Sequence, residues 1–378
     1  MPDESTIIVA GHICIDLIPE ITASADSFGT LLTPGKLVNV GPAVASTGGA
    51  VANTGLALHK LGFPVRLAGK VGDDAFGGVI VEQLRRHGAG LADAMKVDAG
   101  SHTSYTMVLS PPGLDRVFLH HPGANDTFGP EDIDARQLEG AAIFHFGYPP
   151  LMRRLFSDGG RGMTEILKTA RGAGALTSVD MAMPDPQSAS GRVDWRAWLA
   201  AVLPHVDAFL PSYEELAYVL GEPGAPLTLE ALRRFAGQVL ELGAGAAAIK
   251  LGEKGLYLRT ARHLAWSHFT PETLAAWQGR ELLATCCEAE LVGTTGAGDC
   301  TIAGFLAGLF EKKSPEEALA FATAVGACSV EQRDATSGVP AAGHVRERQA
   351  AGWPRHGVAP ELGAWTPTGT PGVFATEE

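Results

Sequence analysis

The chain has 378 residues, of which 46% are hydrophobic and 19% are charged, enough for a sizeable core and too apolar for wholesale disorder. Its formal net charge is −13 at pH 7, without a long Lys/Arg run, which argues against nucleic acid or an anionic membrane as the main partner. No apolar stretch approaches the length of a membrane span, and the acidic start Met1-Pro2-Asp3-Glu4 is unlike a signal peptide. We expect a soluble, cytoplasmic protein.

Cysteine usage points to a reducing environment. Adjacent cysteines have a poor geometry for bridging each other, and the spacing is not that of metal ligands, so we expect reduced and mostly buried thiols. The five cysteines are Cys14, Cys286, Cys287, Cys300 and Cys328.

The first elements are two strand-like segments. Residues 6–11 form a short apolar run that ends in glycine, typical of a buried parallel strand. Residues 13–18 alternate around one acid, Asp16, which the pattern alone allows to face solvent. Residues 20–45 are rich in Thr, Ser, Gly and Pro, so we expect irregular structure or an edge strand there.

A helix is predicted to open at Gly48-Gly49 and to close at Gly62, because Pro64 prevents its continuation. Gly49 and Asn53 lie four residues apart, hence on one face. The two glycines let a polyol approach the backbone, and the Asn amide can donate to and accept from its hydroxyls.

Two alternating segments, 101–109 and 117–121, flank Pro111-Pro112-Gly113 and predict a hairpin in an open sheet. The neighbouring His120 and His121 would point to opposite faces of a strand, so we do not expect them to bind a metal together.

From residue 141 onward, strands and helices alternate, which predicts a parallel sheet with helices on both faces. The predicted strands are 142–146, 175–180, 207–212 and 246–252, and the predicted helices are 161–172, 194–203, 213–221, 229–242 and 315–330. Ligands of such sheets lie beyond the carboxyl ends of the strands. Asp180, Ser212, Lys250 and the turn 293–299 fall at such ends.

The segment Gly293-Thr294-Thr295-Gly296-Ala297-Gly298-Asp299-Cys300 precedes a helix-like apolar stripe. Its glycines permit a sharp turn, and the helix start offers unpaired N–H groups to an anion. A carboxylate beside an anion site is costly at rest, so Asp299 is a candidate base that accepts a proton from an attacking hydroxyl. The alternative is that Asp299 merely caps the helix.

These residues resemble the signatures of the ribokinase-like (PfkB) carbohydrate kinases: Gly48-Gly49 with Asn53, and Gly296-Ala297-Gly298-Asp299. The resemblance covers about residues 5–342. It implies a three-layer α/β/α sandwich with a mainly parallel sheet and a small β-sheet lid from about 12–45 and 98–123, with strands near 13–18 and 37–40. The kinase domain would span 1–342. Residues 343–378 would form a Pro/Gly-rich extension, either held on the surface by Trp353 and Trp365 or partly disordered.

The resemblance also assigns roles to the candidate site residues. For catalysis it implies Asp299 as general base, with Gly296, Ala297 and Gly298 as the anion hole. For the sugar it implies Asp16, Gly48, Gly49, Asn53 and Asn125. For the nucleotide it implies Lys250, Gly252, Gly255, Thr294 and Ser212, and for the metal Glu215.

Two positions depart from the family pattern. Ser212 stands where the family has Asn, so Glu215 is the firmer part of that motif. Gly293 stands where many members carry an Asp that helps to bind a monovalent cation, so the sequence leaves potassium activation open.

The sequence therefore predicts an ATP- and Mg²⁺-dependent kinase acting on a hydroxyl of a small sugar, with a homodimer contact through the lid. It contains no P-loop motif, and no Gly-x-Gly-x-x-Gly follows a strand. Two alternatives stay open: a nucleoside kinase, which would need an aromatic clamp around the base, and a non-catalytic sugar-binding protein on the same fold. The sequence does not identify the sugar, the hydroxyl or the role of residues 261–290.

Overall fold

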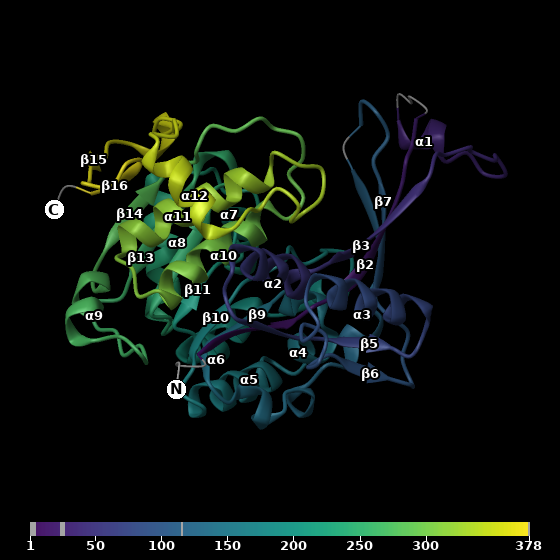
Figure 1. Cartoon of the computed structure of the whole chain (residues 1–378), viewed down its shortest axis with the longest axis horizontal. Coiled ribbons are helices and arrows are strands. Elements are labelled where there is room, and N and C mark those ends of the chain that lie inside the picture. The colour runs from purple at the N-terminus through teal and green to yellow at the C-terminus, as the bar shows by residue number, and fades with distance from the viewer. Residues whose placement is uncertain (1–4, 23–26, 115, 377–378) are drawn as a thin grey trace.

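The structure is a computed structural model that describes residues 5–22, 27–114 and 116–376. Within these residues the central element is a ten-stranded sheet in the order β15-β16-β14-β13-β12-β11-β10-β9-β1-β4 (Figure 1). Neighbours from β4 to β12 pair in parallel, and neighbours from β12 to β15 pair antiparallel. The strands are β1 Thr6–Gly11, β4 Val65–Ala68, β9 Ala141–Gly147, β10 Leu176–Val179, β11 Ala208–Phe209, β12 Ala246–Lys250, β13 Leu256–Thr260, β14 Glu281–Ala284, β15 Thr366–Pro367 and β16 Val373–Ala375.

Helices cover both faces of this sheet, so each face has its own hydrophobic core. Along β1, Ile7 and Val9 point into one core, and Ile8 and Ala10 point into the other, as the two-residue period of a strand requires. One face carries α2 Ala50–Leu61, α3 Ala75–His87, α9 Pro271–Trp277, α10 Ala297–Phe310, α11 Pro315–Ser329 and α12 Ala342–Ala350. The other carries α4 Arg153–Ser157, α5 Arg161–Gly172, α6 Trp195–Val202, α7 Tyr213–Val219 and α8 Leu229–Glu241.

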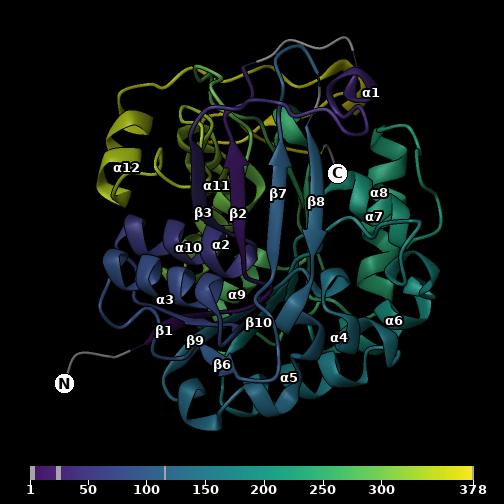
Figure 2. The ribbon, with the colours of Figure 1, turned by 90° about the vertical axis from the view of Figure 1, so that its right-hand side faces the viewer.

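A smaller four-stranded sheet projects from this body, as Figures 1 and 2 show. Its order is β3-β2-β7-β8, with β2 and β7 parallel and the outer pairs antiparallel. The register places Asp16, Thr106 and His120 in one row on one face. Its strands are β2 Cys14–Pro19, β3 Ala43–Gly48, β7 Tyr105–Leu109 and β8 Val117–His121, and α1 Phe28–Leu31 lies near its outer end.

The predicted fold class is confirmed: a three-layer α/β/α arrangement with a mainly parallel sheet and a small second sheet. Helix α2 begins after Gly49 and ends before Gly62, whose φ of +94° is the left-handed conformation that suits a helix end. The strand expected near residues 37–40 is wrong, because β3 is Ala43–Gly48. These six residues pair with the whole length of β2, whereas residues 37–40 lie outside every described strand.

Two further sequence predictions can be compared with the described residues. All five cysteines are free, and all except the partly exposed Cys286 are buried. No helix in the described part of the chain has the length and apolarity needed to cross a bilayer.

The C-terminal segment packs against the body. Strand β16 pairs with β14 and so extends the central sheet. The Arg355 guanidinium donates to the carbonyl oxygens of Thr285 at 2.6 Å and Ala320 at 2.8 Å. The Trp365 ring packs edge-on against Tyr257, with 6.2 Å between ring centroids.

We expect this packing to contribute strongly to stability. Val373 in β16 is 1% exposed, so Val373→Asp would bury a charge without a partner and lower the free energy of unfolding by about 3 kcal/mol. Ala364→Asp, on an exposed residue of the same segment, is the control and should cost under about 0.5 kcal/mol. Urea unfolding measures both, and equal small effects would show that the segment is not part of the folded core.

Candidate active site

The carboxyl ends of several strands converge on the start of helix α10. Strands β1, β9 and β10 are neighbours, and the residues that follow them are His12, Tyr148 and Asp180. Lys250 ends β12, and its side chain runs beside α10, with Cδ 3.5 Å from the point where a Cβ of Gly298 would lie. Residues distant in the sequence therefore meet at the edge of the sheet where ligands of open α/β sheets bind.

Helix α10 starts with a turn that only glycine fits easily. Gly296 is the N-cap with a φ of +72°, and a side chain there would overlap Ala335. No side chain in the described part of the chain caps the helix, so its first N–H groups and its positive dipole end are available to an anion. Asp299 lies in the first turn, not at the N-cap, and is 4% exposed. The alternative in which Asp299 merely caps the helix is therefore wrong.

The Asp299 carboxylate is held by donors from two other elements. Asn53 Nδ2 of α2 donates to Oδ2 at 2.9 Å. The Tyr148 hydroxyl, from the turn after β9, lies 2.7 Å from Oδ1 and 2.8 Å from Oδ2. Thr54 Oγ1 donates to the backbone carbonyl of Asp299 at 3.4 Å. Asn53 and Asp299, 246 residues apart, thus share one site.

Burial and like charges set the electrostatics of this site. Burial raises the pKa of Asp299, while the Tyr148 hydrogen bond, the Lys250 charge and the Asn53 amide act to lower it. Burial also raises the pKa values of Asp180 and Glu215, and in both cases the Lys250 ammonium opposes the shift. The Lys250 ammonium therefore favours the ionised forms of three neighbouring acids, Asp299, Asp180 and Glu215.

Asp16 faces the same region from the small sheet. Cys14 Sγ donates to Asp16 Oδ1 at 3.4 Å, and the Thr106 hydroxyl in the same row lies 3.0 Å from His120 Nδ1. A side chain at Gly48 would overlap the Asp16 carboxylate, so glycine there leaves room for that carboxylate. Burial raises the pKa of Asp16.

His12 lies between the two sheets and is 1% exposed. Neither ring nitrogen has a hydrogen-bond partner among the described residues. Burial lowers the pKa of His12 to about 3, so the imidazole is neutral at pH 7. Its ring centroid lies 5.3 Å from that of His120 and 6.0 Å from that of Tyr148. A Cβ at Gly49 would lie 2.6 Å from His12 Nδ1, so the glycine lets the helix start approach this ring.

Asn125 is fully buried, and its side chain forms hydrogen bonds with the backbone of Ile13. Its Nδ2 donates to the Ile13 carbonyl at 2.9 Å, and its Oδ1 accepts from the Ile13 N–H at 3.3 Å. Asn125 thus fixes the chain between β1 and β2, where His12 lies. Direct contact between Asn125 and a sugar stays a prediction.

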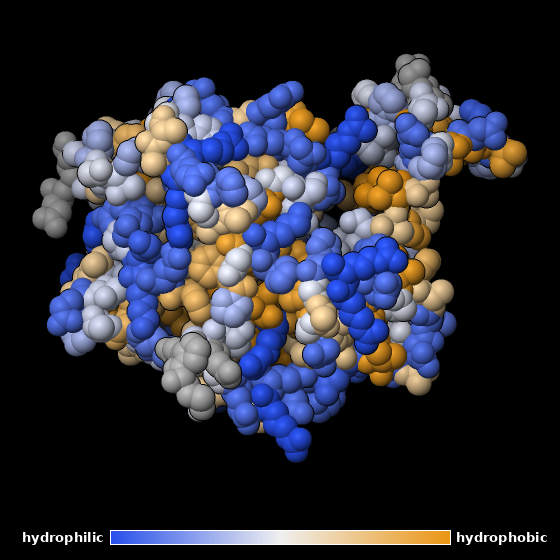
Figure 3. Space-filling model, in the orientation of Figure 1, coloured by the Kyte–Doolittle hydropathy of each residue, from blue (hydrophilic) through white to orange (hydrophobic). Residues whose placement is uncertain are grey.

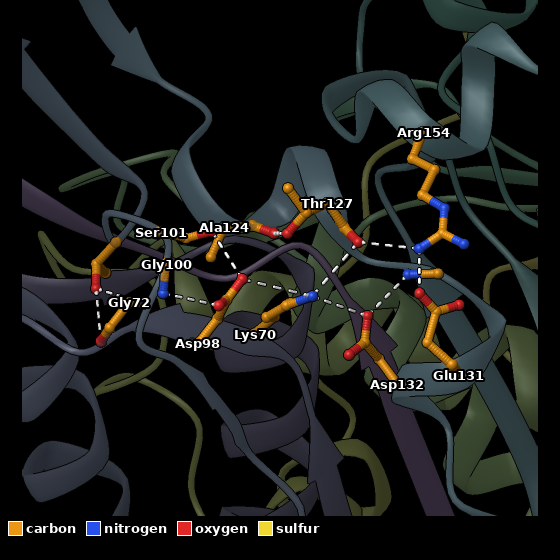
Figure 4. Close-up of polar contacts among 12 residues, drawn as sticks. Lys70, Gly72, Asp98, Gly100, Ser101, Ala124, Thr127, Glu131, Asp132 and Arg154 are labelled. Carbon is orange, nitrogen blue, oxygen red and sulfur yellow. Dashed lines mark hydrogen bonds and ion pairs between the residues drawn. The ribbon is translucent and has the colours of Figure 1, made fainter.

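An ion-pair network supports the short 3₁₀ helix Gly123–Thr127 that carries Asn125 (Figure 4). Lys70 Nζ lies 3.2 Å from Asp132 Oδ2 and 3.8 Å from Asp98 Oδ2, and it donates to the Thr127 carbonyl at 3.4 Å. The Lys70 side chain is 12% exposed, so these contacts hold a largely buried cation. Their role is to position the backbone next to the site.

Ser212 and Glu215 form a capping box at the start of α7. Ser212 Oγ accepts from the Glu215 N–H at 3.2 Å, and Glu215 Oε2 accepts from the Ser212 N–H at 2.6 Å. Ser212 also forms an isolated parallel β-bridge with Lys250, which places the capping box next to the cation of the site.

The remaining predicted nucleotide residues lie in two turns. Gly252 and Gly255 have positive φ values of 60° and 113°, and a side chain at Gly255 would overlap the Ala284 carbonyl. Arg116, between β7 and β8, donates to the hydroxyl of Thr294 at 3.0 Å and to that of Thr295. The hairpin of the small sheet thus touches the glycine turn before α10.

The acids near Lys250 are the candidate ligands for a magnesium ion. No group of three His, Cys, Asp or Glu side chains within the described ranges could hold a metal. Oδ2 of Asp180 is buried and has no hydrogen-bond partner among the described residues. Glu215 is close enough to Lys250 and Asp299 for their charges to shift its pKa. Two carboxylates with phosphate and water oxygens fit the way in which Mg²⁺ is usually bound in phosphoryl-transfer sites.

At Gly293, a Cβ would lie 2.8 Å from the Gln332 carbonyl, so no carboxylate fits there without a backbone shift.

Sequence reasoning missed Tyr148, His12 and Arg116 as members of this site. Tyr148 follows Gly147 at the end of β9, so the strand-end rule that singled out Asp180 could also have found it. His12 follows β1 in the same way. The contact of Arg116 depends on how the hairpin folds over the body, for which the local sequence gives no signal.

Comparison with known proteins agrees with this geometry. The sequence model of the family described as "pfkB family carbohydrate kinase" matches residues 5–342. The chain belongs to the pfkB family of carbohydrate kinases. Its members are phosphotransferases, which confirms the predicted family and enzyme class.

Individual relatives are distant from this pfkB family member. An uncharacterized sugar kinase of Archaeoglobus fulgidus is 24% identical over 75% of this chain and 98% of its own length. A probable fructokinase-3 of Arabidopsis thaliana is 24% identical over 89% of each chain. The solved structure of Arabidopsis thaliana ribokinase with ribose and ATP is 21% identical in sequence. The match covers 91% of this chain and 98% of the ribokinase chain, and its TM-score of 0.68 shows the shared fold.

The glycine turn before α10 offers a direct test of the anion site. Gly296→Ala would place a side chain at a φ of +72° and against Ala335, so the turn must shift. We expect turnover to fall at least about tenfold because a shift of about 1 Å misplaces the N–H donors. The matched control is Gly343→Ala in α12, where a Cβ meets open space and turnover should be unchanged. Equal activity of both variants would contradict a role for this turn.

Proposed function

We propose that this protein transfers the γ-phosphoryl group of ATP to a hydroxyl of an uncharged sugar, with Asp299 as general base. The observation that carries the proposal is the position of Asp299. Its carboxylate is buried in the first turn of a helix without a side-chain cap and is held by Asn53 and Tyr148. A base and an anion-binding backbone thus lie within one turn, which is what hydroxyl phosphorylation needs.

The residues divide the reaction between them. ATP supplies the phosphoryl group, and Glu215 and Asp180 would hold a Mg²⁺ ion, which would supply positive charge to offset that of the phosphates. Asp299 takes the proton as the sugar oxygen bonds to the γ-phosphorus, and the electrons of the breaking P–O bond pass to ADP. N–H groups of residues 296–299 donate to the phosphoryl oxygens, and Lys250 adds positive charge on the same side. On the nucleotide side, the turn with Gly252 and Gly255, with Thr294 and Ser212, would line the path of ATP.

The sugar side suits a neutral polyol. Asp16 can accept two hydroxyl hydrogen bonds, and the neutral His12 offers one donor and one acceptor without a partner among the described residues. Gly48 and Gly49 leave the backbone open to approach. Two carboxylates, Asp16 and Asp299, would repel an acidic or phosphorylated sugar.

A nucleoside acceptor is the second candidate, and one observation favours it. The centroid of the His12 ring lies 5.3 Å from that of His120 and 6.0 Å from that of Tyr148. The three rings offer flat surfaces to the base of a nucleoside. The same neutral rings also suit the apolar face of a sugar, so we place the sugar first.

A homodimer through the small sheet is part of the proposal. The face opposite Asp16 carries Met107 and Leu119 in one cross-strand row, 38% and 50% exposed. Such exposed apolar side chains favour contact with a second copy.

The decisive experiment is ADP release across pentoses, hexoses, acidic sugars and nucleosides. We expect turnover on a neutral sugar, and Asp299→Asn should lower kcat by about 10²–10⁴ with sugar affinity largely kept, because it removes the base and keeps the shape. The control is Asp334→Asn, which should keep turnover. The Asp334 carboxylate accepts hydrogen bonds from the Ser337 hydroxyl and from the Thr336 N–H.

Each other result has a defined meaning. Turnover on a nucleoside alone would keep the chemistry and change the substrate. A sugar that raises the melting temperature without any ADP release would support a non-catalytic binding protein. Full turnover by Asp299→Asn would contradict the assigned base.

A further inference from the structure

Tyr148 reaches the active site through a strained backbone. Its φ of 62° and ψ of 45° lie in the left-handed region, which side-chain-bearing residues rarely adopt. Pro149 follows and restricts the conformation further. Such strain persists where the surrounding structure imposes it, and it gathers at functional sites.

Contacts on both sides impose this conformation. The Tyr148 N–H donates to Asp180 Oδ1 at 3.2 Å, and the Tyr148 carbonyl accepts from the Leu151 N–H at 3.0 Å. Asp180 is itself 0% exposed, so it is a fixed acceptor. The turn therefore aims the phenol from the end of β9 at the first turn of α10.

The phenol and the Asn53 amide share the Asp299 carboxylate unequally. Oδ2 accepts from Asn53 and lies 2.8 Å from the phenol oxygen, whereas the phenol, at 2.7 Å, is the one donor to Oδ1 among the described residues. A carboxylate oxygen can accept more than one hydrogen bond, so Oδ1 keeps capacity for an acceptor hydroxyl.

We propose that Tyr148 is a positioning residue for phosphoryl transfer, whose hydroxyl orients the Asp299 carboxylate and favours its ionised form. This inference rests on the proposed function and deepens it. The phenol keeps its own proton throughout and acts on the acceptor hydroxyl only through the Asp299 carboxylate.

The electrostatics support a donor role and not a base role for the phenol. Burial, together with the charges of Asp299 and Asp180, raises the pKa of Tyr148 well above its ordinary value, so the phenol stays protonated. Its hydrogen bond lowers the pKa of Asp299 against the effect of burial.

Other groups also face Asp299 and must be counted. Lys250 from β12 favours the carboxylate, and the acids Asp180 after β10 and Glu215 in α7 disfavour it. Burial raises the pKa of Cys300, the next residue in α10, well above its ordinary value, so this residue stays a thiol. Removal of the phenol leaves all four of these groups in place.

The test compares two phenols that each bond a carboxylate. Tyr148→Phe removes the hydroxyl and keeps the ring. Tyr257→Phe, in β13 and thus in a different part of the sheet, removes the hydroxyl that donates to Glu281 Oε1 of β14 at 2.9 Å. Loss of a donor makes Asp299 harder to ionise, so the acid limb of the kcat–pH profile should move to higher pH in Tyr148→Phe. At a pH on that limb, kcat should fall about tenfold more than on the plateau. Tyr257→Phe should keep the wild-type profile.

Tyr148→Asn provides a second variant that tolerates the left-handed backbone, because Asn adopts it more readily than Tyr. Asn has no phenol to donate to Asp299, so we expect the same shift of the acid limb to higher pH. An unmoved limb in both Tyr148 variants would overturn the positioning role, even if turnover is uniformly lower.

Infrared titration without substrate gives an independent readout. The carboxyl band that is absent from Asp299→Asn should persist to higher pH in Tyr148→Phe than in the wild type, and an unchanged band would overturn the inference. Wild-type turnover in Asp299→Asn would instead overturn the proposed function. The two failures are therefore distinguishable.

Discussion

The burial of one carboxylate, Asp299, is the constraint around which the site is built. A carboxylate removed from water is unfavourable unless donors and a cation replace the lost hydration. Asn53, Tyr148 and Lys250 supply that replacement from α2, the end of β9 and the end of β12. In the proposed reaction, the same burial would strengthen every electrostatic interaction with a transferring phosphoryl group, because a buried site screens charges less than water does.

This arrangement costs stability and is supported from outside the site. Three neighbouring acids around a single lysine, and a left-handed backbone at Tyr148, are each unfavourable in isolation. They are held by elements that are stable for other reasons, such as β1, whose side chains are buried on both faces of the sheet. Asn125 and the Lys70 ion pairs add support by fixing the segment on which His12 lies.

The sequence predicted the fold well because its signals are local and periodic. The glycines at both ends of α2, the apolar runs of β1 and β12, and the strand–helix alternation each follow from a few adjacent residues. Asp299 and Asn53 were singled out by the glycine turn before a helix, by spacing on a helix face and by the resemblance to the pfkB family, but the contact between the two side chains was not predicted. Arg116 was missed because its contact depends on how distant elements meet, whereas Tyr148 follows the end of β9 and could have been found by the strand-end rule. The strand at residues 37–40 was misplaced because pairing with β2 decides its position.

The most direct test of the account is the pH dependence of the chemical step itself, measured by rapid-quench single turnover with saturating ATP, Mg²⁺ and sugar. With Asp299 as the base, formation of the phosphorylated sugar should fall about tenfold per pH unit below the pKa of one group. That pKa should lie above the ordinary Asp value of about 3.9, because burial raises the pKa of Asp299. A chemical step that stays constant down to the ordinary range of an aspartate would contradict the central claim that a buried, hard-to-ionise Asp299 takes the proton.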